Sequence, residues 1–340
     1  MMENKNSAPY KVAIIGYGKM GKNHFRVLKE DSRFVVDSIL DPQLSTLQGP
    51  LLECFDQEEP FFQRIKSSKP DFCIVASATS SHLEMARRLA PLQIPFLIEK
   101  PLALNVDQAH EIFKISKDLK VPIFAGHVER FNPVIGKLRE VLDSGMIGTP
   151  IHFSITRVGG YPASKNIKDN VLLDLAVHDL DLLKFLVGSV TVRSSVCHST
   201  WQKDLYDTAE ILCACENGSS ASIHVNWVTP TKIRTMRVTG TKGVAFLDYV
   251  LQSCTVIGGN ILDPHHNADP QFTKFIEEYK NTDRTEFGIL KAEPLKIQLD
   301  HIFNFLSGKQ HHLCSAEDGA KAVSLAQMAI EMGAGGRNMV

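Results

Sequence analysis

Two kinds of hydrophobic spacing alternate along the first third of the chain. Short runs rich in β-branched residues are separated by longer stretches whose apolar residues recur at helical spacing, and this alternation is typical of parallel βαβ units. The predicted strands are residues 11–15, 34–40, 71–76, 96–99 and 121–125, and the predicted helices are residues 21–30, 81–92 and 105–119. We therefore expect a doubly wound parallel sheet, completed by the strand at 121–125, in a first domain of residues 1–125.

The pattern changes after about residue 150, where strand-like runs follow one another with fewer helices between them. Short connections between successive strands predict an antiparallel sheet in a second domain, residues 126–340. An alternative arrangement for its C-terminal helices is to pack back on the first domain. The expected strands are residues 151–158, 190–198, 208–215, 219–227, 235–239 and 243–248, the expected helices are 172–186, 295–306 and 317–332, and the polar segment 257–283 is expected on the surface.

The length of 340 residues predicts two domains, because single hydrophobic cores usually stop growing at ~250 residues. An apolar content of 44% is ordinary for a packed globular protein. A formal net charge of −1 gives no global field for a polyanion, so we expect neither a nucleic-acid nor a membrane partner. The seven cysteines contain no C-x-x-C pair, which argues against a disulfide framework and favours reduced thiols in the cytoplasm. The sequence has neither a signal-peptide core near its start nor a run approaching ~20 apolar residues.

A glycine-rich segment, Gly16-Tyr17-Gly18-Lys19-Met20-Gly21, directly follows the first predicted strand and opens the first predicted helix. In that context a G-x-G-x-x-G loop aims backbone N–H groups and the positive end of the helix dipole at a pyrophosphate. Asp41 ends the second strand, where a carboxylate can hydrogen-bond the adenosine ribose and repel a 2′-phosphate. We therefore predict NAD in preference to NADP. The alternative is a structural glycine turn in which Asp41 caps the turn before Pro42.

Polar residues also follow two other strands at the same edge of the predicted sheet. Lys100, within Glu99-Lys100-Pro101, lies at the carboxyl end of a parallel strand, where ligands of open α/β sheets bind, and it can donate to a substrate hydroxyl. Thr79 and His82 follow the preceding strand. We predict that these five residues line the cofactor site. A solvated strand end at Lys100 and a packing or capping role for His82 are the alternatives.

Asp174 and His178 are spaced i,i+4 on a predicted helix, so both side chains project from one face about a turn apart. A carboxylate beside an imidazole fixes its tautomer and raises its basicity, which suits removal of a hydroxyl proton. Asp179 and Asp181 offer a metal cluster as an alternative, but on a helix they point around different faces, and we predict no metal. A plain surface Asp–His pair is the other alternative. It is the favoured interpretation of these two residues taken alone, but not when Lys100 is considered with them.

Five ordered motifs give the chain a resemblance to the Gfo/Idh/MocA oxidoreductases along nearly its whole length. They are GYGKMGKNH (16–24), ATSSH (78–82), EKPLA (99–103), GHVERFNP (126–133) and DLAVHDLD (174–181). The resemblance implies a Rossmann domain followed by an α/β domain with a large, open, mostly antiparallel sheet that mediates homo-oligomerisation, as a dimer or a tetramer. It further implies hydride transfer between NAD(P) and a sugar or cyclitol carbon. By carry-over, Lys100 is similar to the catalytic lysine, His178 to the acid/base and Asp174 to its neighbour that orients the substrate.

Two of these motifs, GHVERFNP and DLAVHDLD, are similar to those of the branch that includes UDP-N-acetylglucosamine 3-dehydrogenases. This similarity implies a nucleotide-sugar substrate oxidised at C3, with Arg130 and Asn132 near it. Arg157 is a candidate for the diphosphate, because its planar guanidinium pairs bidentately with phosphate oxygens, but it could equally form an ion pair with a neighbouring strand. Two other functions stay open: an inositol or free-sugar dehydrogenase of the same fold, and a non-catalytic NAD-binding regulator.

Overall fold

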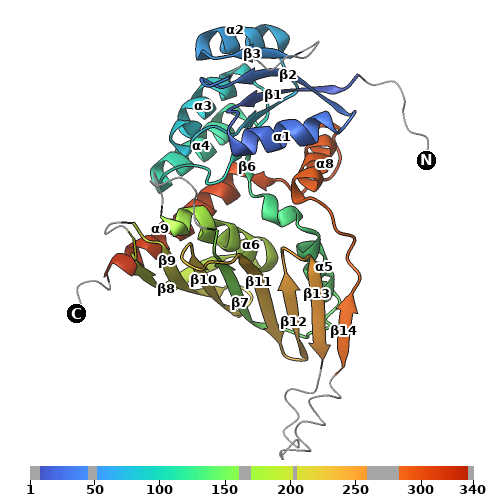
Figure 1. The fold of residues 1–340 in the computed structure, drawn as a ribbon, viewed down its shortest axis with the longest axis vertical. Helices are drawn as coiled ribbons and strands as arrows, with labels where there is room; N and C mark the ends of the chain where they lie inside the picture. The colour runs from blue at the N-terminus through green and yellow to red at the C-terminus, as the bar shows by residue number, and fades with distance from the viewer. Residues whose placement is uncertain (1–7, 45–51, 161–169, 202–204, 259–282, 336–340) are drawn as a thin grey trace, which may run out of the picture. The chain divides into compact units, whose positions relative to one another are not determined.

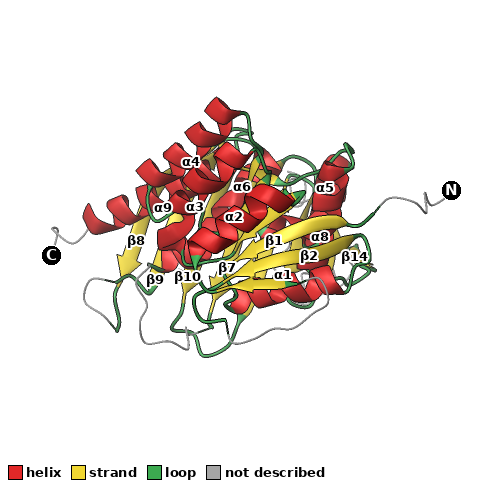
Figure 2. Ribbon diagram, turned by 90° about the horizontal axis from the view of Figure 1, so that it is seen from above, coloured by secondary structure: helices red, strands yellow, loops and turns green. Residues whose placement is uncertain are grey.

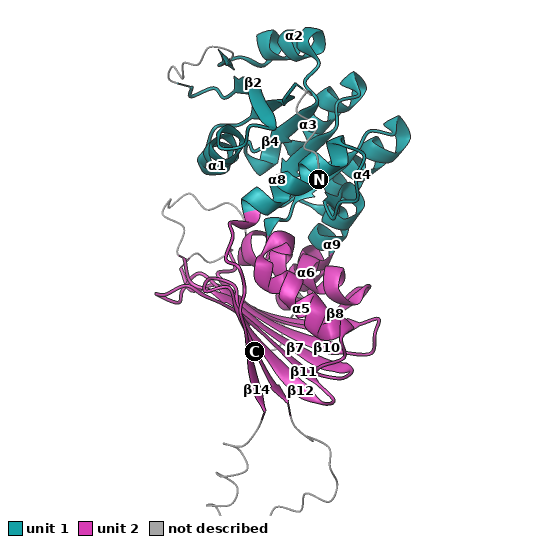
Figure 3. Ribbon diagram, turned by 90° about the vertical axis from the view of Figure 1, so that its right-hand side faces the viewer, with its two compact units in different colours: residues 1–128, 295–324 teal, residues 129–294, 325–340 magenta. Residues whose placement is uncertain are grey.

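The computed structural model describes residues 8–44, 52–160, 170–201, 205–258 and 283–335, which form two compact units (Figure 3). Unit 1 comprises residues 1–128 and 295–324, and unit 2 comprises residues 129–294 and 325–340. A segment from near the C-terminus therefore belongs with the N-terminal residues. Within the described residues, no helix is long and apolar enough to cross a membrane.

Unit 1 is built on a seven-stranded sheet with the order β15-β6-β5-β4-β1-β2-β3 (Figure 1). All of its neighbouring strands are parallel except β15 and β6. The predicted Rossmann sheet is thus confirmed, but the expectation that 121–125 completes it is wrong, because β15 adds an antiparallel edge. A strand of two residues has too few positions to show a period. The strands are β1 (Tyr10–Ile15), β2 (Phe34–Leu40), β3 (Glu53–Phe55), β4 (Phe72–Val75), β5 (Phe96–Glu99), β6 (Ile123–Gly126) and β15 (Cys314–Ser315).

Helices cover both faces of this sheet (Figure 2). The connection from β1 to β2 and the connections from β3 through β6 run in opposite directions across the sheet, and right-handed crossovers then place their helices on opposite faces. Accordingly, α1 and α8 lie on one face, and α2, α3 and α4 lie on the other. The helices are α1 (Lys19–Lys29), α2 (Glu58–Ser68), α3 (His82–Leu89), α4 (Val106–Leu119) and α8 (Pro294–Leu306), with 3₁₀ turns at η1 (Thr79–Ser81) and η2 (Ala90–Leu92). The helix α9 (Ala316–Gly335) begins in unit 1 and belongs to unit 2 from residue 325, and the 3₁₀ turn η3 (Val128–Phe131) belongs to unit 2 from residue 129.

The central strands of unit 1 are buried on both sides, as a sheet covered by two helical layers requires. All four residues of β4 and the last four residues of β1 are buried. These strands read as continuous apolar runs in the sequence for that reason. Functional groups are accordingly confined to the ends of the strands, where the backbone turns towards the helices.

Unit 2 is built on an eight-stranded sheet with the order β14-β13-β12-β11-β7-β10-β9-β8. Every neighbouring pair is antiparallel except β7 and β10, so the predicted mostly antiparallel sheet is confirmed. Figure 3 shows α5 (Pro133–Asp143) and α6 (Val177–Val187) on the same face of this sheet. The strands are β7 (Pro150–Val158), β8 (Val190–His198), β9 (Thr208–Cys215), β10 (Ser220–Asn226), β11 (Ile233–Gly240), β12 (Gly243–Asp248), β13 (Ser253–Gly258) and β14 (Arg284–Phe287).

Two features of unit 2 differ from the expectation. The predicted surface segment 257–283 lies almost entirely outside the described residues, and β13 and β14 flank it. The single helix expected at 172–186 is a π-helical segment, η4 (Leu172–Ala176), that continues into α6. The composition of this segment does not predict a π-helix, because leucine and alanine favour a helix without distinguishing an α-helical from a π-helical turn. The wider turn is one that occurs often at functional sites.

The two faces of the unit 2 sheet differ in polarity. Phe153 and Ile155 of β7 are buried on the face that the helices cover, whereas Ser154 and Thr156 alternate with them on the other face. That second face also carries exposed Leu212 and Phe246. Its contribution to a homo-oligomer stays a prediction.

Candidate functional site

The three glycines of the loop between β1 and α1 have different surroundings. A Cβ atom built on Gly16, whose φ is +93°, would lie 2.4 Å from the Ser77 amide nitrogen, and one built on Gly21 would lie 2.0 Å from the Gly16 carbonyl oxygen. At Gly18, apart from the glycine itself and its two neighbours in the chain, no atom of the described residues lies within 4 Å of the Cβ position. Gly16 and Gly21 therefore shape the loop, while Gly18 leaves an open space at its tip.

The N-terminus of α1 suits a negatively charged ligand. Gly18 is its N-cap residue and has no side chain to cap the first N–H groups of the helix. Its first turn contains no acidic residue, and it begins with Lys19. The first backbone N–H groups of a helix lack partners within the helix and carry a partial positive charge. These features suit a pyrophosphate at the open side of Gly18, and Gly16 to Gly21 are the residues that would hold the dinucleotide.

Asp41 closes the glycine loop against the end of β2. Its Oδ2 accepts a hydrogen bond from the Tyr17 amide at 2.6 Å, and its Oδ1 accepts one from the Gln43 amide at 2.8 Å. Each carboxylate oxygen can accept more than one hydrogen bond, so Asp41 retains the capacity to bind ribose hydroxyls. The bond to Gln43 is a turn cap of the kind that the sequence offered as an alternative, and the bond to Tyr17 gives Asp41 a role in loop shape that sequence reasoning did not assign.

Lys100 follows β5 and is linked to the glycine loop through His82. The imidazole of His82 is buried, with Nδ1 at 3.1 Å from the Pro101 carbonyl oxygen and Nε2 at 3.2 Å from the Ser77 carbonyl oxygen. Burial lowers the pKa of His82, although the carbonyl oxygens around it act in the opposite direction. Ser77 is also the residue on which Gly16 packs. His82 therefore bridges the segment after β4 to the segment that contains Lys100, and Thr79 lies at the start of the intervening η1 turn.

A second histidine, which sequence reasoning did not single out, pairs with the residue that precedes the lysine. Nε2 of His24, on α1, is 2.6 Å from Oε1 of Glu99, the last residue of β5, and both side chains are buried. The only sequence signal was its place at the end of the GYGKMGKNH motif, three residues after Gly21.

In unit 2, Asp174 and His178 stand out from their surroundings by exposure. Every residue from Val171 to Leu183, a stretch described throughout, is buried except these two. Asp174 lies in the η4 π-helix and His178 in the first turn of α6. The carboxylate Oδ2 of Asp174 accepts a hydrogen bond from the indole Nε1 of Trp227 at 3.1 Å. The buried Trp227 is thus a partner of Asp174 that sequence reasoning missed, and an orienting bond from Asp174 to His178 stays a prediction.

The two arginines predicted near the substrate are buried in ion pairs within unit 2. Arg130 donates from Nε to Asp181 Oδ2 at 2.7 Å and from NH2 to Asp181 Oδ1 at 2.5 Å. Arg157 donates from Nε and NH2 to both oxygens of Asp179, at 2.8 and 2.9 Å, and from NH1 to Glu129 at 3.0 Å. Burial opposes the charge of Arg157, but the attraction of Asp179 and Glu129 raises its pKa above the ordinary value. Both aspartates weighed for a metal therefore have an arginine partner.

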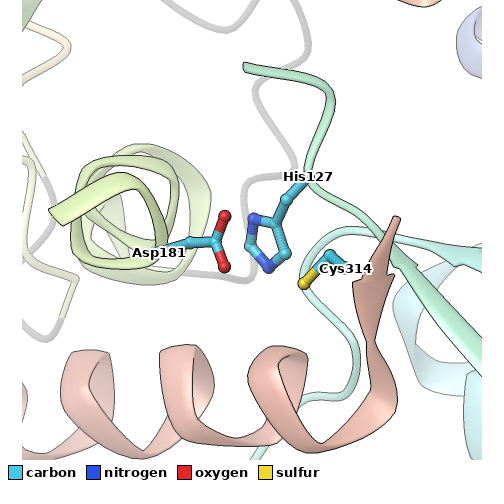
Figure 4. A group of neighbouring side chains, drawn as sticks. All are labelled: His127, Asp181 and Cys314. Carbon is cyan, nitrogen blue, oxygen red and sulfur yellow. The ribbon is translucent and has the colours of Figure 1, made fainter. Parts of the chain in front are cut away.

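Figure 4 shows Asp181 on α6 of unit 2, and His127 and Cys314 of unit 1. His127 follows β6 directly, and Cys314 of β15 pairs with Ala125 of β6. Cys314 and His127 thus lie at the sheet edge that the sequence did not predict.

Asn132 and Arg234 complete the polar groups around these ion pairs. Asn132 caps α5, because its Oδ1 accepts from the Val134 amide, and its Nδ2 donates to the Tyr249 carbonyl oxygen at 3.1 Å. Arg234 of β11 pairs in register with Arg157 of β7. Its hydrogen bonds within the described residues go to backbone carbonyl oxygens, at 2.9 Å for the nearest, and burial lowers its pKa. Sequence reasoning missed Arg234, since nothing in its local sequence distinguishes it.

Comparison with known proteins places these features in a family. Residues 10–127 match the family model described as "Oxidoreductase family, NAD-binding Rossmann fold", and residues 135–246 match the model of the "GFO/IDH/MocA C-terminal domain". The rhizopine catabolism protein MocA of Rhizobium meliloti is 22% identical over 245 residues, which cover 69% of this chain and 77% of that protein. The scyllo-inositol 2-dehydrogenase (NAD(+)) of Bacillus subtilis is 25% identical over 257 residues, which cover 69% of this chain and 72% of that protein.

A solved structure shows the same fold over nearly the whole chain. The UDP-N-acetylglucosamine 3-dehydrogenase GnnA from Acidithiobacillus ferrooxidans has a TM-score of 0.77 at 18% identity, with 95% of this chain and 97% of that chain covered. The two family models together span both the N-terminal and the central parts of the sequence. The protein therefore belongs to the Gfo/Idh/MocA family of oxidoreductases, and residues 10–127 are its NAD-binding Rossmann domain.

Proposed function

We propose that this protein is an NAD-dependent dehydrogenase that transfers hydride between a sugar ring carbon, in its hydroxyl and ketone forms, and the nicotinamide. The observation that carries the proposal is the arrangement within unit 1. The open space above Gly18, the bridging His82 and the lysine at the end of β5 follow three strands at one edge of the parallel sheet. Open α/β sheets bind their ligands at this edge, beside the point where the strand order reverses.

The proposed chemistry assigns a separate task to each polar group. Oxidation of a secondary alcohol removes a proton from the hydroxyl oxygen and a hydride from the carbon that bears it, and bound NAD would supply the hydride acceptor. His178 takes the hydroxyl proton, Asp174 holds the imidazole in the reactive tautomer, and Lys100 stabilises the developing negative charge on oxygen. The reverse assignment, with Lys100 as the formal base, uses the same residues. Trp227 fixes the Asp174 carboxylate through its indole N–H.

The favoured substrate is a nucleotide sugar, with oxidation at C3 of UDP-N-acetylglucosamine as the specific form. Support comes from the GHVERFNP and DLAVHDLD motifs and from the likeness in fold to GnnA. Arg130, Asn132 and Arg157 are the proposed substrate residues. For Arg157 to bind a diphosphate, it must exchange hydrogen bonds to Asp179 or Glu129 for bonds to the ligand.

An inositol or a free sugar is the second candidate, and one observation favours it. The guanidinium groups of Arg130 and Arg157 are already paired with carboxylates inside unit 2. A neutral polyol does not require these pairs to open, whereas a diphosphate does. The scyllo-inositol 2-dehydrogenase among the relatives agrees with this alternative.

A substrate panel tests the two candidates directly. The protein is incubated with NAD or NADP and with UDP-N-acetylglucosamine, UDP-glucose, myo-inositol, scyllo-inositol or glucose, and the absorbance of the reduced nicotinamide is followed. We expect turnover with a UDP-sugar and NAD. Turnover confined to the inositols replaces the first candidate by the second, and dinucleotide binding without turnover on any alcohol indicates a regulator.

Replacing Lys100 with alanine tests the proposed mechanism. We expect turnover to fall by about 100-fold or more, because one preorganised donor to a developing oxyanion contributes about 3 kcal/mol. Dinucleotide affinity should be retained, since the pyrophosphate site lies at the glycine loop. Lys100→Arg keeps the charge and serves as the matched control. Unchanged turnover of Lys100→Ala removes the lysine from the mechanism.

A further inference from the structure

The hydrogen bond between His24 and Glu99 connects two motifs that are far apart in the sequence. His24 lies on α1, the helix that begins at the glycine loop, and Glu99 immediately precedes Lys100. Their side chains are 3% and 7% exposed, and the His24 Nε2 to Glu99 Oε1 distance is 2.6 Å. A polar pair at this depth is stable only when its hydrogen bonds are made, because an unsatisfied buried group costs about 1–3 kcal/mol.

The other oxygen of the same carboxylate accepts a hydrogen bond from the lysine backbone. The Lys100 amide nitrogen is 3.3 Å from Glu99 Oε2. A backbone amide can only donate, so Oε2 is an acceptor, and a hydrogen bond from the imidazole to Oε1 is donated by its Nε2–H. One side chain thus joins the dinucleotide-loop helix to the backbone of Lys100.

The neighbouring strand leaves room for this carboxylate. A Cβ built on Gly126, at the end of β6, would lie 2.9 Å from Glu99 Oε2 and 3.0 Å from the Glu99 Cα. Any side chain at position 126 would therefore push the carboxylate away from its place. The absence of a side chain at Gly126 gives the Glu99 carboxylate the room it occupies between β6 and α1.

We propose that His24 and Glu99 are positioning residues for Lys100. Their buried hydrogen bond holds the backbone at residue 100 in a fixed relation to the helix that begins at the dinucleotide loop. This inference rests on the proposed function for the role of Lys100, but the positioning itself is measurable without turnover. A displacement of about 1 Å at a reacting group can lower the rate by about 100-fold.

Two variants and their combination separate positioning from simple stabilisation. His24→Leu leaves the Glu99 carboxylate without its imidazole partner, and Glu99→Met leaves both the His24 imidazole and the Lys100 amide without theirs, so each should be less stable than the wild type. The double variant removes both members of the His24–Glu99 pair and should recover the stability that one unpaired member costs, because replacing both partners by apolar groups is nearly neutral. The Lys100 amide still lacks its acceptor in this variant, so the recovery should fall short of the wild type. If the pair positions Lys100, kcat of the double variant stays about 10- to 100-fold below wild type despite the recovered stability.

Amide hydrogen exchange at residue 100, measured on the protein alone, is the second measurement. We expect faster exchange at Lys100 in His24→Leu and in the double variant, and retained protection in His24→Gln, whose amide places an N–H donor near the position of Nε2. Asp37→Asn, at a buried carboxylate of β2 that pairs with Arg64, is the matched control and should leave exchange at residue 100 unchanged. If His24→Leu does not fold, Glu99→Gln tests the same hydrogen bonds in the same volume.

The possible results decide between the two roles. Recovery of both stability and kcat in the double variant means that the pair only stabilises the fold, and the proposal is overturned. Wild-type exchange at residue 100 in His24→Leu overturns it as well. If Lys100→Ala retains full turnover, the proposed function of the lysine fails, and the exchange data still show whether His24 and Glu99 hold its backbone.

Discussion

Replacing each glycine of the loop by alanine separates the residues that shape the loop from the residue that faces the ligand. At Gly18 the backbone angles are φ −67° and ψ −160°, which alanine adopts without strain. In the described residues no atom lies within 4 Å of the added methyl group. Gly18→Ala should therefore be as stable as the wild type or more stable by about 0.4–1 kcal/mol, because alanine restricts the unfolded chain.

The same methyl group occupies the space in which we place the pyrophosphate. Its presence should remove at least one hydrogen bond between a backbone N–H and a phosphate oxygen. Such a bond to a charged group contributes about 1.5–3 kcal/mol, so dinucleotide affinity should fall by about 10- to 150-fold. Stability and affinity are thus expected to change independently at this position.

Gly16→Ala and Gly21→Ala should behave in the opposite way. A Cβ added at Gly21 is excluded by the Gly16 carbonyl oxygen at 2.0 Å, and overpacking of this kind costs about 1–3 kcal/mol. In Gly16→Ala the new Cβ is excluded by the Ser77 amide, and a non-glycine residue at φ +93° also introduces backbone strain of about 1–3 kcal/mol. Both variants should unfold at lower denaturant concentration, with Gly16→Ala the less stable of the two.

The assay combines urea unfolding with NADH fluorescence titration for the wild type and each variant. Gly136→Ala is the control, because Gly136 is exposed on α5 and, within the described residues, its Cβ position is free of contacts to 4 Å. This control should gain up to about 1 kcal/mol of stability from helix propensity and leave NADH affinity unchanged. Wild-type affinity in Gly18→Ala, or wild-type stability in Gly21→Ala, would refute the assignment of the glycines.

Three further predictions concern single side chains. Trp227→Phe removes the N–H donor to Asp174, so kcat should fall, dinucleotide affinity should be retained, and the free energy of unfolding should drop by about 1–3 kcal/mol. Trp201→Phe, at an exposed position, is the control and should change neither kcat nor stability. Steady-state kinetics measure kcat, and urea unfolding measures stability. Asp41→Asn removes a negative charge and should raise kcat/KM with NADP relative to NAD by about 5-fold, equivalent to about 1 kcal/mol; an unchanged ratio argues against ribose recognition by Asp41. Burial lowers the folded-state pKa of His82 below its ordinary value of 6.5, so the unfolded state binds the proton more readily. Stability should be complete above about pH 6.5 and fall as the pH drops below it, by up to about 1.4 kcal/mol per unit, and this slope should diminish in His82→Gln.

Local patterns were sufficient to predict the glycine loop and most of the strands. The loop is contiguous in sequence, and its chemistry depends on a strand before it and a helix after it, both of which show a clear period. The helix begins at Lys19, two residues before the predicted start at Gly21, because the last glycine packs inside the first turn. Strands β3 and β15 have three and two residues, too few for a period to be visible.

The partners of the site residues could not be predicted in this way, because they come from distant segments. His24 and Glu99 are 75 positions apart, and Asp174 and Trp227 are 53 positions apart. The predicted partner of Asp174 was chosen for being one helical turn away, and that rule assumes an α-helix. In η4 the turn is wider, so spacing in the sequence no longer fixes which side chains meet.

The buried ion pairs of unit 2 show why residue type alone misjudges an arginine. Arg157 has the guanidinium fork that suits a diphosphate, but Asp179 and Glu129 already fill that geometry. Opening a buried pair leaves a carboxylate without its counter-charge, which costs about 3–5 kcal/mol and must be offset by the ligand. Arg234, the neighbour of Arg157 in register, bonds only to backbone carbonyl oxygens among the described residues and opens no ion pair when it turns to a ligand. If a UDP-sugar is the substrate, Arg234→Ala should therefore raise its KM at least as much as Arg157→Ala while destabilising the fold less.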